Sequence, residues 1–334
     1  MCLWPRNYIC TMIKDVDAPT AFIDSLPAVR QLITRTLRQS DPSLAEVMVH
    51  LTREDGKNLR AALLLATAAD GADMVCHEAI VAAASLEILH LATLIHDDII
   101  DEAPTRRGQP SVQSRFGKKT AVLGGDYLFC TSFAMVAGIS TRYPDKLVDF
   151  SRGITRICVG EIRQHQHNGD TELSTYGYLR TIAGKTAALF ALAMYSGSIL
   201  GGDTEKEARL AGRIGLCIGM HFQLADDCMD YEASSETLRK STKHDLGEGV
   251  ITLPLIMALA ADPGLRELIR DRVLSADEIA SITADVVRLG GVAGSWRVAD
   301  RYYRKAAALL EQIADPVKKE RLAAILEKIQ NRQH

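Results

Sequence analysis

Residues 79–101 read AIVAAASLEILHLATLIHDDIID, a long apolar run that ends in a cluster of aspartates. Alanine and leucine dominate the run, and both favour α-helix over β-strand. Glu87 and His90 lie inside it, which is typical of a helix buried in a protein core rather than one that crosses a bilayer. The stretch therefore predicts a buried helix that carries acidic side chains at its C-terminal end.

The rest of the chain is also predicted to be helical. Alternating runs of β-branched residues with hairpin turns are missing. Capping boxes, in which a Ser or Thr and a later Glu satisfy the first amides of a helix, are expected at Ser43, Thr204 and Ser275. Residues 316–331 are expected to form an amphipathic helix. We therefore predict an all-α fold.

Length and composition restrict the classes of protein to consider. The 334 residues are 47% hydrophobic and 24% charged, which suits one large core over 19–334 after a loosely attached segment, 1–18. The net charge of -3 lacks the basic excess of a nucleic-acid binder. Seven widely spaced cysteines without a C-x-x-C pair argue for a reducing cytosol, and the N-terminus lacks a signal-peptide pattern. We therefore expect a cytoplasmic protein with no transmembrane segment and no nucleic-acid partner.

The pattern D-D-x-x-D occurs twice in segments predicted to be helical, and its aspartates are Asp97, Asp98, Asp101, Asp226, Asp227 and Asp230. Residues four apart lie on one face of a helix, so the first and last aspartates of each pattern project together. Like charges at that spacing destabilise a helix, and burial adds to the cost unless a cation compensates. One such cluster would fit a solvated helix end equally well. Two copies favour Mg²⁺, a hard cation that bridges carboxylates to substrate phosphates, and predict a diphosphate held between the two helices.

A polyanionic substrate also needs cationic partners. Candidates stand near the aspartate clusters or at the start of an apolar helix: Lys57, Arg60, Arg106, Arg107, Lys185 and Lys240. Arginine offers a planar fork for phosphate oxygens and lysine a point charge. Lys185 interrupts an apolar helix, so it needs a partner or must reach the surface. His90 precedes Asp97 by two turns on nearly the same face, and Gln223 shares the face of Asp226.

Residues 94–110 resemble the first aspartate-rich motif of trans-type polyprenyl diphosphate synthases, and residues 222–230 resemble the second. The resemblance covers about residues 20–331, with shorter matches in the expected order at 56–60, 124–127, 184–186 and 245–256. It implies an isoprenoid synthase-like fold, a single large helical bundle around a deep central cavity, with the catalytic domain over 19–334. The activity it implies is a magnesium-dependent prenyltransferase reaction, carried out by a homodimer, that adds isopentenyl diphosphate head-to-tail to an allylic diphosphate.

The resemblance also assigns roles to residues. The six aspartates would gather Mg²⁺, about three ions per site, around the allylic diphosphate. That diphosphate would also be contacted by Arg106, Lys185 and Lys240. Isopentenyl diphosphate would be held by Lys57, Arg60, His90 and Arg107. The reacting centre would be lined by Thr186 and Gln223. One departure concerns the usual Gly-Lys-Arg-x-Arg-Pro, which reads GKNLRA over 56–61, so that a cation and the proline are missing.

Product length is predicted from the residues one turn before the first aspartate cluster. Ala92 and Thr93 are small where short-chain members of the family place a bulky aromatic floor. This predicts a long product, heptaprenyl to decaprenyl, which would go to a membrane. A floor set deeper by Leu89, Phe129 or Phe133 would instead give a geranylgeranyl or farnesyl product.

Three other classes share some of these features. A terpene cyclase has the first motif and a helical cavity, but it usually carries a different second metal motif. A carboxylate-bridged di-iron bundle would use the E-x-x-H of Glu87 and His90, but it needs a second such motif. A non-catalytic subunit of a heteromeric synthase tends to lose aspartates or the arginine pair, and this chain keeps both.

Overall fold

The computed structural model describes residues 18–52, 56–106, 108–139, 146–232, 246–247, 249–269 and 274–331. Contacts divide the chain into two compact units. The first lies within Met1–Ser151 and Ala193–Ala211, and the second within Arg152–Leu192 and Gly212–His334. Helices α8 (Lys146–His167), α10 (Ala188–Leu200) and α11 (Glu205–Glu232) contain residues of both units.

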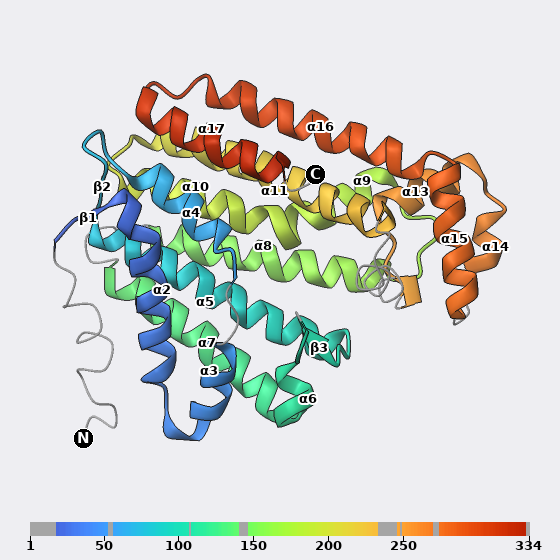
Figure 1. Cartoon of the computed structure of the whole chain (residues 1–334), viewed down its shortest axis with the longest axis horizontal. Helices are drawn as coiled ribbons and strands as arrows, with labels where there is room; N and C mark the ends of the chain where they lie inside the picture. The colour runs from blue at the N-terminus through green and yellow to red at the C-terminus, as the bar shows by residue number, and fades with distance from the viewer. Residues whose placement is uncertain are drawn as a thin grey trace. The chain divides into compact units, whose positions relative to one another are not determined.

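The first unit contains the N-terminal helices of Figure 1: α2 (Phe22–Arg38), α3 (Ala45–Leu51), α4 (Leu59–Ala68), α5 (His77–Ile100), α6 (Val112–Phe116) and α7 (Lys118–Ile139). Two short antiparallel pairs connect them, β1 (Thr20–Ala21) with β2 (Met74–Val75) and β3 (Thr105–Arg106) with β4 (Gln109–Pro110). The strands are only two residues long, so the predicted all-α class holds.

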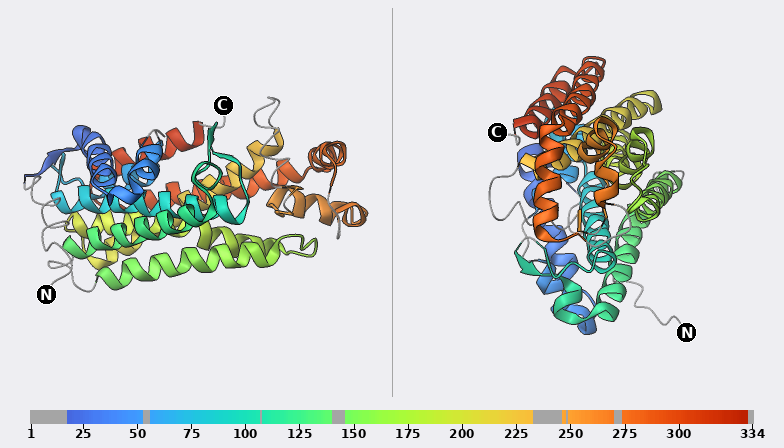
Figure 2. Two further views of the ribbon diagram at one scale, coloured as in Figure 1. Left: turned by 90° about the horizontal axis from the view of Figure 1, so that it is seen from below. Right: turned by 90° about the vertical axis from the view of Figure 1, so that its right-hand side faces the viewer.

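Helix α5 forms the core of the first unit. It packs against α2, α4 and α7, and it runs beside α7 in Figure 1 and Figure 2. Every residue from Ala79 to Leu89 is buried, so the helix is enclosed on all sides. The prediction of a buried helix over this apolar stretch is therefore confirmed.

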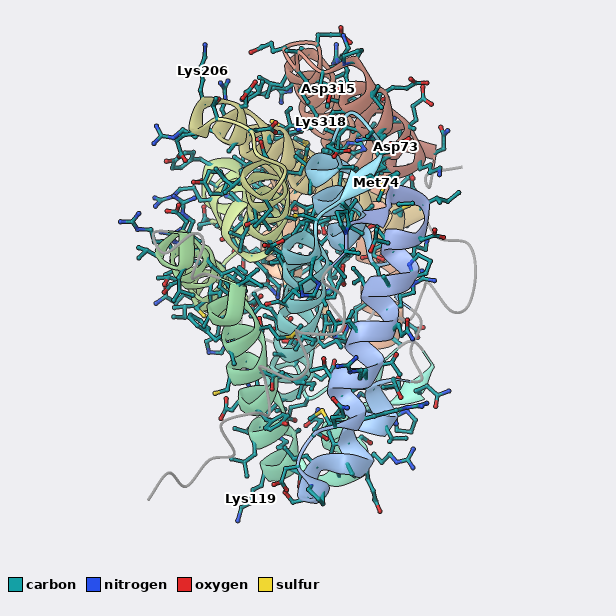
Figure 3. The ribbon with its side chains drawn as sticks, turned by 90° about the vertical axis from the view of Figure 1, so that its left-hand side faces the viewer. Asp73, Met74, Lys119, Lys206, Asp315 and Lys318 are labelled. Atoms are coloured by element: carbon teal, nitrogen blue, oxygen red, sulfur yellow. The ribbon has the colours of Figure 1, made fainter. Side chains whose placement is uncertain are left out.

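The second unit holds α9 (Thr175–Ile182), the π-helical turn η3 (Ala183–Ala187), α13 (Leu253–Ala261), α14 (Leu265–Ile269), α15 (Ala276–Arg288), α16 (Gly291–Leu310) and α17 (Pro316–Gln330). Its core gathers around α13, which packs against α15 and α16 and is buried along most of its length. Helix α17 buries Leu322, Leu326 and Ile329 and confirms the predicted amphipathic helix. Asp315, labelled in Figure 3, caps it by accepting from the amides of Val317 at 2.9 Å and Lys318 at 3.1 Å.

Two of the three predicted capping boxes are confirmed. The hydroxyl of Ser275 accepts from the Glu278 amide, and the Glu278 carboxylate accepts from the Ser275 amide at 2.8 Å. Thr204 and Glu207 make the same reciprocal pair.

The capping box predicted at Ser43 is wrong. Ser43 lies inside a 3₁₀ turn, Pro42–Leu44, whose cap is Asp41. The Asp41 carboxylate accepts from the amide and the hydroxyl of Ser43 at 2.9 and 2.5 Å, so this hydroxyl is already used when α3 begins at Ala45. An aspartate before a proline at the first helical position is the stronger start signal.

Three described helices are long and apolar enough to cross a membrane by length and composition: His77–Ile100, Lys118–Ile139 and Thr175–Leu200. Their most apolar windows are 72%, 39% and 61% buried inside the protein. The segment predicted to be loosely attached, 1–18, lies outside the described residues except for Ala18. One catalytic domain over 19–334 stays a prediction.

Candidate active site

The first aspartate cluster lies at the C-terminal end of α5. Asp97 and Asp98 belong to its last turn, and Asp101 is the C-cap residue, whose amide donates to the Asp97 carbonyl at 2.8 Å. Asp97 and Asp101 are half-buried, whereas the Asp98 side chain is only 3% exposed. The outer two carboxylates are therefore accessible, and the middle one is enclosed by protein.

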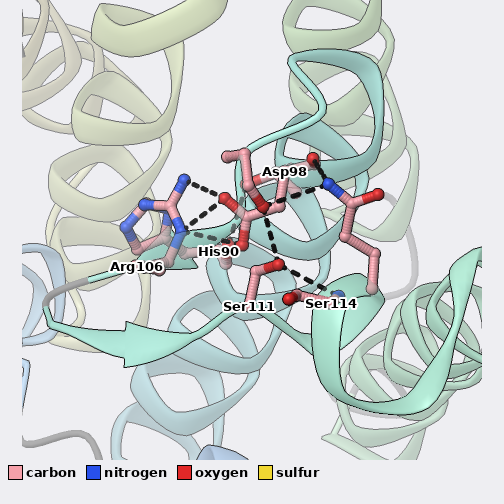
Figure 4. Close-up of polar contacts among 8 residues, drawn as sticks. His90, Asp98, Arg106, Ser111 and Ser114 are labelled. Carbon is pink, nitrogen blue, oxygen red and sulfur yellow. Dashed lines mark hydrogen bonds and ion pairs between the residues drawn. The ribbon is translucent and has the colours of Figure 1, made fainter. Parts of the chain in front are cut away.

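Asp98 is held by Arg106, which reaches back from β3. The guanidinium donates through Nε to both carboxylate oxygens, at 2.8 and 3.0 Å, and through a terminal nitrogen to Oδ1 at 2.8 Å (Figure 4). Such a fork restricts both partners to one geometry. The structure thus brings two predicted site residues together as an ion pair. Arg107 lies outside the described residues.

A second set of bonds ties the hairpin of β3 and β4 to the end of α5. The side-chain amide of Gln113 donates to the Asp98 carbonyl at 2.5 Å and to the Ala103 carbonyl at 3.1 Å. Ser111, the N-cap of α6, donates to the same Ala103 carbonyl at 2.7 Å (Figure 4). Because the hairpin that carries Arg106 is fixed in this way, the Asp98–Arg106 pair is preorganised.

His90, labelled in Figure 4, lines a pocket in the first unit. The pocket has an empty volume of about 610 Å³, part of it open to solvent, and is lined by Arg30, Ile33, Thr34, Leu37, Leu51, Thr52, Gly56, Asn58, Glu87, His90, Leu91 and Leu94. Of the nearby predicted cations, Lys57 is exposed and Arg60 is half-buried. Arg30 is a pocket residue that the sequence interpretation missed, because nothing in the sequence brings α2 to this place.

Glu87 has a structural role in the same region. It is buried, and its carboxylate accepts from the Ala61 amide in the first turn of α4 at 2.9 Å. This bond fixes the start of α4, directly after Lys57, against α5. Within the part of the chain that the structure describes, no three His, Cys, Asp or Glu side chains are grouped as a metal site.

The second aspartate cluster, in α11, repeats the arrangement of the first. Asp226 and Asp230 are half-buried, and Asp227 is only 6% exposed. Asp227 accepts from the Tyr178 hydroxyl and from the Gln223 side-chain amide, the latter at 2.8 Å. Gln223 in turn accepts from the Thr186 hydroxyl at 2.7 Å. Three predicted residues, Thr186, Gln223 and Asp227, therefore form one hydrogen-bonded chain within the second unit.

Tyr178 completes this chain and was not predicted. Its burial raises the pKa of its hydroxyl well above the ordinary value of 10, and the neighbouring Asp227 carboxylate raises that pKa further. The hydroxyl therefore keeps its proton and acts as a donor to Asp227. A buried tyrosine needs a polar partner for its hydroxyl, but the sequence does not say which one.

Lys185 has the partner that its apolar surroundings required. Its ammonium lies 2.8 Å from the Glu161 carboxylate of α8, and both side chains are 23% exposed. It sits in the π-helical turn η3, a feature frequent at functional sites. A Cβ on Gly160 would lie 2.1 Å from the Lys185 amide nitrogen, so only glycine allows α8 to approach this turn so closely. Lys240 lies outside the described residues.

The two residues predicted to set product length differ in their surroundings. Ala92 is fully buried in α5. Thr93 is half-buried, and its hydroxyl donates to the His90 carbonyl at 2.8 Å. Thr93 is therefore the more accessible of the two.

The donors fit magnesium. In each unit, two half-buried carboxylates stand four residues apart on a helix, beside a third that is occupied by protein donors. Oxygen-only donors of this kind suit a hard divalent cation that keeps some water and takes its other ligands from substrate phosphates.

An all-α fold that carries two such aspartate clusters, the first of them paired with Arg106, is that of the isoprenoid synthase class of helical enzymes. A family model described as Polyprenyl synthetase matches residues 41–286, which is more than half of the chain. The chain belongs to the polyprenyl synthetase family, whose members are prenyltransferases.

Similar proteins include enzymes that make long products. The chain is 30% identical over 311 residues to heptaprenyl diphosphate synthase component 2 of Bacillus subtilis (strain 168), covering 92% of this chain and 88% of that protein. It is 37% identical over 262 residues to the all-trans-nonaprenyl-diphosphate synthase (geranyl-diphosphate specific) of Rhodobacter capsulatus, covering 77% and 78%. Its fold matches the crystal structure of a polyprenyl synthase from Caulobacter crescentus CB15 complexed with calcium and isoprenyl diphosphate, with a TM-score of 0.84, 30% identity, and coverage of 99% and 100%.

Proposed function

We propose that the chain catalyses repeated head-to-tail condensation of isopentenyl diphosphate with an allylic diphosphate. The observation that carries this proposal is the repeated arrangement of the two aspartate clusters. In each, the outer carboxylates are accessible and the middle one is locked by protein donors. This leaves metal-binding oxygens on a rigid support, as diphosphate chemistry requires.

The outer aspartates Asp97, Asp101, Asp226 and Asp230 would hold magnesium. When bound, the metal neutralises charge on the departing diphosphate of the allylic substrate. The calcium and isoprenyl diphosphate of the Caulobacter structure support a divalent cation and a prenyl diphosphate ligand for this chain.

The reaction exchanges one bond for another. The allylic C–O bond breaks, the double bond of isopentenyl diphosphate forms a C–C bond to the allylic carbon, and the released diphosphate takes up the proton lost from the adduct. Arg106 and Lys185, held by Asp98 and Glu161, would add positive charge beside the leaving group. The chain of Thr186, Gln223 and Asp227 would position polar groups at the reacting centre.

We propose a long product, heptaprenyl to decaprenyl, with geranylgeranyl or farnesyl as the alternative. An apolar pocket of about 550 Å³, part of it open to solvent, lies further along α5 and is lined by Ala82 and Leu86 of that helix, with residues of α7, α8 and α10. At 1.5 Å per residue, Ala82 is about 22 Å along α5 from Asp97. Space at that depth supports a growing chain that passes Ala92 and Thr93.

A homodimer and a cytoplasmic location are the states we infer for the chain. Val122 and Leu123 give α7 an exposed apolar edge that suits a helix from a second copy. The five cysteines in the described part are free thiols, as a reducing compartment would keep them. A heteromer is the alternative, because the Bacillus subtilis relative is named component 2.

The test is incubation of the purified single chain with labelled isopentenyl diphosphate, an allylic primer and Mg²⁺, followed by product sizing. Asp97→Asn and Asp226→Asn should each lower kcat by about a hundredfold or more. No turnover by the single chain, restored by a second protein, would identify a heteromeric subunit. A cyclic hydrocarbon product would identify a terpene cyclase.

Product length can be probed in the same assay by placing a ring at two depths. Thr93→Phe, about 6 Å from Asp97 along the helix, should shorten the product strongly. Ala82→Phe should give an intermediate length. Thr93 is preferred to Ala92 for the shallow block, because a ring at the fully buried Ala92 would overpack the core. Unchanged products from both variants would show that α5 does not line the growing chain.

A further inference from the structure

We infer that Arg30 of α2 binds the diphosphate of isopentenyl diphosphate and supplies the positive charge that Asn58 does not. The inference rests on the proposed function and adds a substrate contact from a helix that carries none of the predicted site residues. It explains how a chain with Asn58 at a position where the family usually has a cation still balances the charge of this substrate.

Arg30 and Thr34 stand one turn apart on α2 and line the same pocket as Asn58 and His90. Helix α2 is anchored by its packing on α4 and α5, with Val29 and Leu37 buried. The backbone that carries Arg30 is therefore held beside the predicted isopentenyl diphosphate residues.

The pocket has one cationic and one acidic side chain among its described lining residues. Of the described residues that line it, Arg30 is the only Arg or Lys, and Glu87 is the only acid. The Glu87 carboxylate accepts from the Ala61 amide, and Arg30 makes no ion pair or hydrogen bond with another described residue. An exposed guanidinium with no counter-ion among the described residues, in a pocket that Asn58 and His90 also line, offers the fork that suits phosphate oxygens.

Arg30 and Thr34 also line an open groove along α2, with Gln31, Arg35, Arg38 and Gln39. Cations along a groove raise the local concentration of an anionic ligand. Because Arg30 belongs to both the groove and the pocket, it marks the place where an arriving diphosphate would pass from solvent to its binding position.

The experiment compares Arg30→Gln with Arg38→Gln, which lies two turns further along α2 and lines the groove but not the pocket. Arg30→Gln should raise the KM for isopentenyl diphosphate roughly tenfold, the value of one charge-assisted hydrogen bond. The KM for the allylic substrate should not change. Titration of isopentenyl diphosphate into the protein without allylic substrate should show the same weakening. Arg38→Gln should change neither constant by more than about twofold.

A conservative variant separates loss of charge from loss of folding. Arg30→Lys keeps a cation at this place in the pocket and should retain most of the affinity for isopentenyl diphosphate that Arg30→Gln loses. If the wild type is active and Arg30→Gln leaves the KM for isopentenyl diphosphate unchanged, the inference is wrong. It is also wrong if Arg38→Gln raises that KM as much as Arg30→Gln does. A wild type that condenses no substrate overturns the proposed function instead, and the two failures are therefore distinguishable.

Discussion

The middle aspartate of each cluster is enclosed, and its partners decide whether it is tolerated there. Asp98 takes a forked guanidinium, whereas Asp227 takes a tyrosine hydroxyl and a glutamine amide. A buried carboxylate that loses a donor retains its desolvation cost without compensation. At the scale of single residues, Arg106 and Tyr178 therefore stabilise the folded protein and also fix the geometry of the site.

Arg106→Ala should lower the free energy of unfolding by about 1–3 kcal/mol, because Asp98 stays buried after its partner is removed. Urea denaturation followed by circular dichroism measures this change. Lys118→Ala is the control, since Lys118 pairs with Glu102 on the exposed surface, where such pairs contribute little. Equal midpoints for the two variants would contradict the argument.

Tyr178→Phe removes only the hydroxyl that donates to Asp227. We expect a loss of about 1–3 kcal/mol in unfolding free energy and a lower kcat, since Asp227 also orients Gln223. The matched control is Tyr176→Phe on the same helix, because the Tyr176 side chain is exposed. If Tyr178→Phe and Tyr176→Phe have the same unfolding free energy and the same kcat, the hydrogen bond to Asp227 contributes neither to stability nor to catalysis.

At the scale of elements, the S/T-x-x-E pattern predicted the start of a helix only where no stronger capping residue came before it. Ser275 and Thr204 form the expected boxes, but Asp41 displaces Ser43 from that role. The need of Lys185 for a partner was predictable from its apolar neighbours. Its partner was not, because Glu161 lies on another helix and reaches it only through the close approach of α8 and η3.

Gly160→Ala tests that close approach. The added methyl group would overlap the backbone of Lys185, so the helices must separate, at a cost of about 1–3 kcal/mol in unfolding stability. Activity should fall with it as Lys185 moves. Gly153→Ala on the same helix meets only the end of the Leu192 side chain, which can adjust, and should be milder in thermal melts and turnover assays.

At the scale of the whole molecule, the fold class followed from composition and periodicity, because long apolar and amphipathic stretches have few alternatives to helix packing. The metal chemistry proposed for the aspartate clusters rests on their spacing. What the sequence did not provide were contacts between residues far apart in the chain. Tyr178 with Asp227, and the position of Arg30 beside Asn58 and His90, depend on tertiary packing that no local pattern encodes.

The stability of the folded chain should fall as the pH drops through about 6.5, and His221 is one cause. Its ring is buried against the Ala299 carbonyl, and this burial lowers its pKa below the ordinary 6.5. The unfolded state therefore takes up a proton at a pH where the folded state does not, so acid favours unfolding. Urea midpoints at pH 7.5 and 5.5 should differ less in His221→Gln than in wild type. The exposed His165→Gln should keep the wild-type difference.

The π-helical turn at Ala183–Ala187 has a consequence for how the gene can vary. Such a turn holds one residue more than an α-turn, so it offsets the register of the flanking segments by about 100°. Tyr178 lies before it and Phe190 after it, and both are buried. Loss of one codon here would leave an unbroken α-helix in which Tyr178 and Phe190 keep nearly the same relative direction, because the turn already absorbs the extra residue. A single-residue deletion should therefore disturb packing less in this turn than within either flanking α-helix.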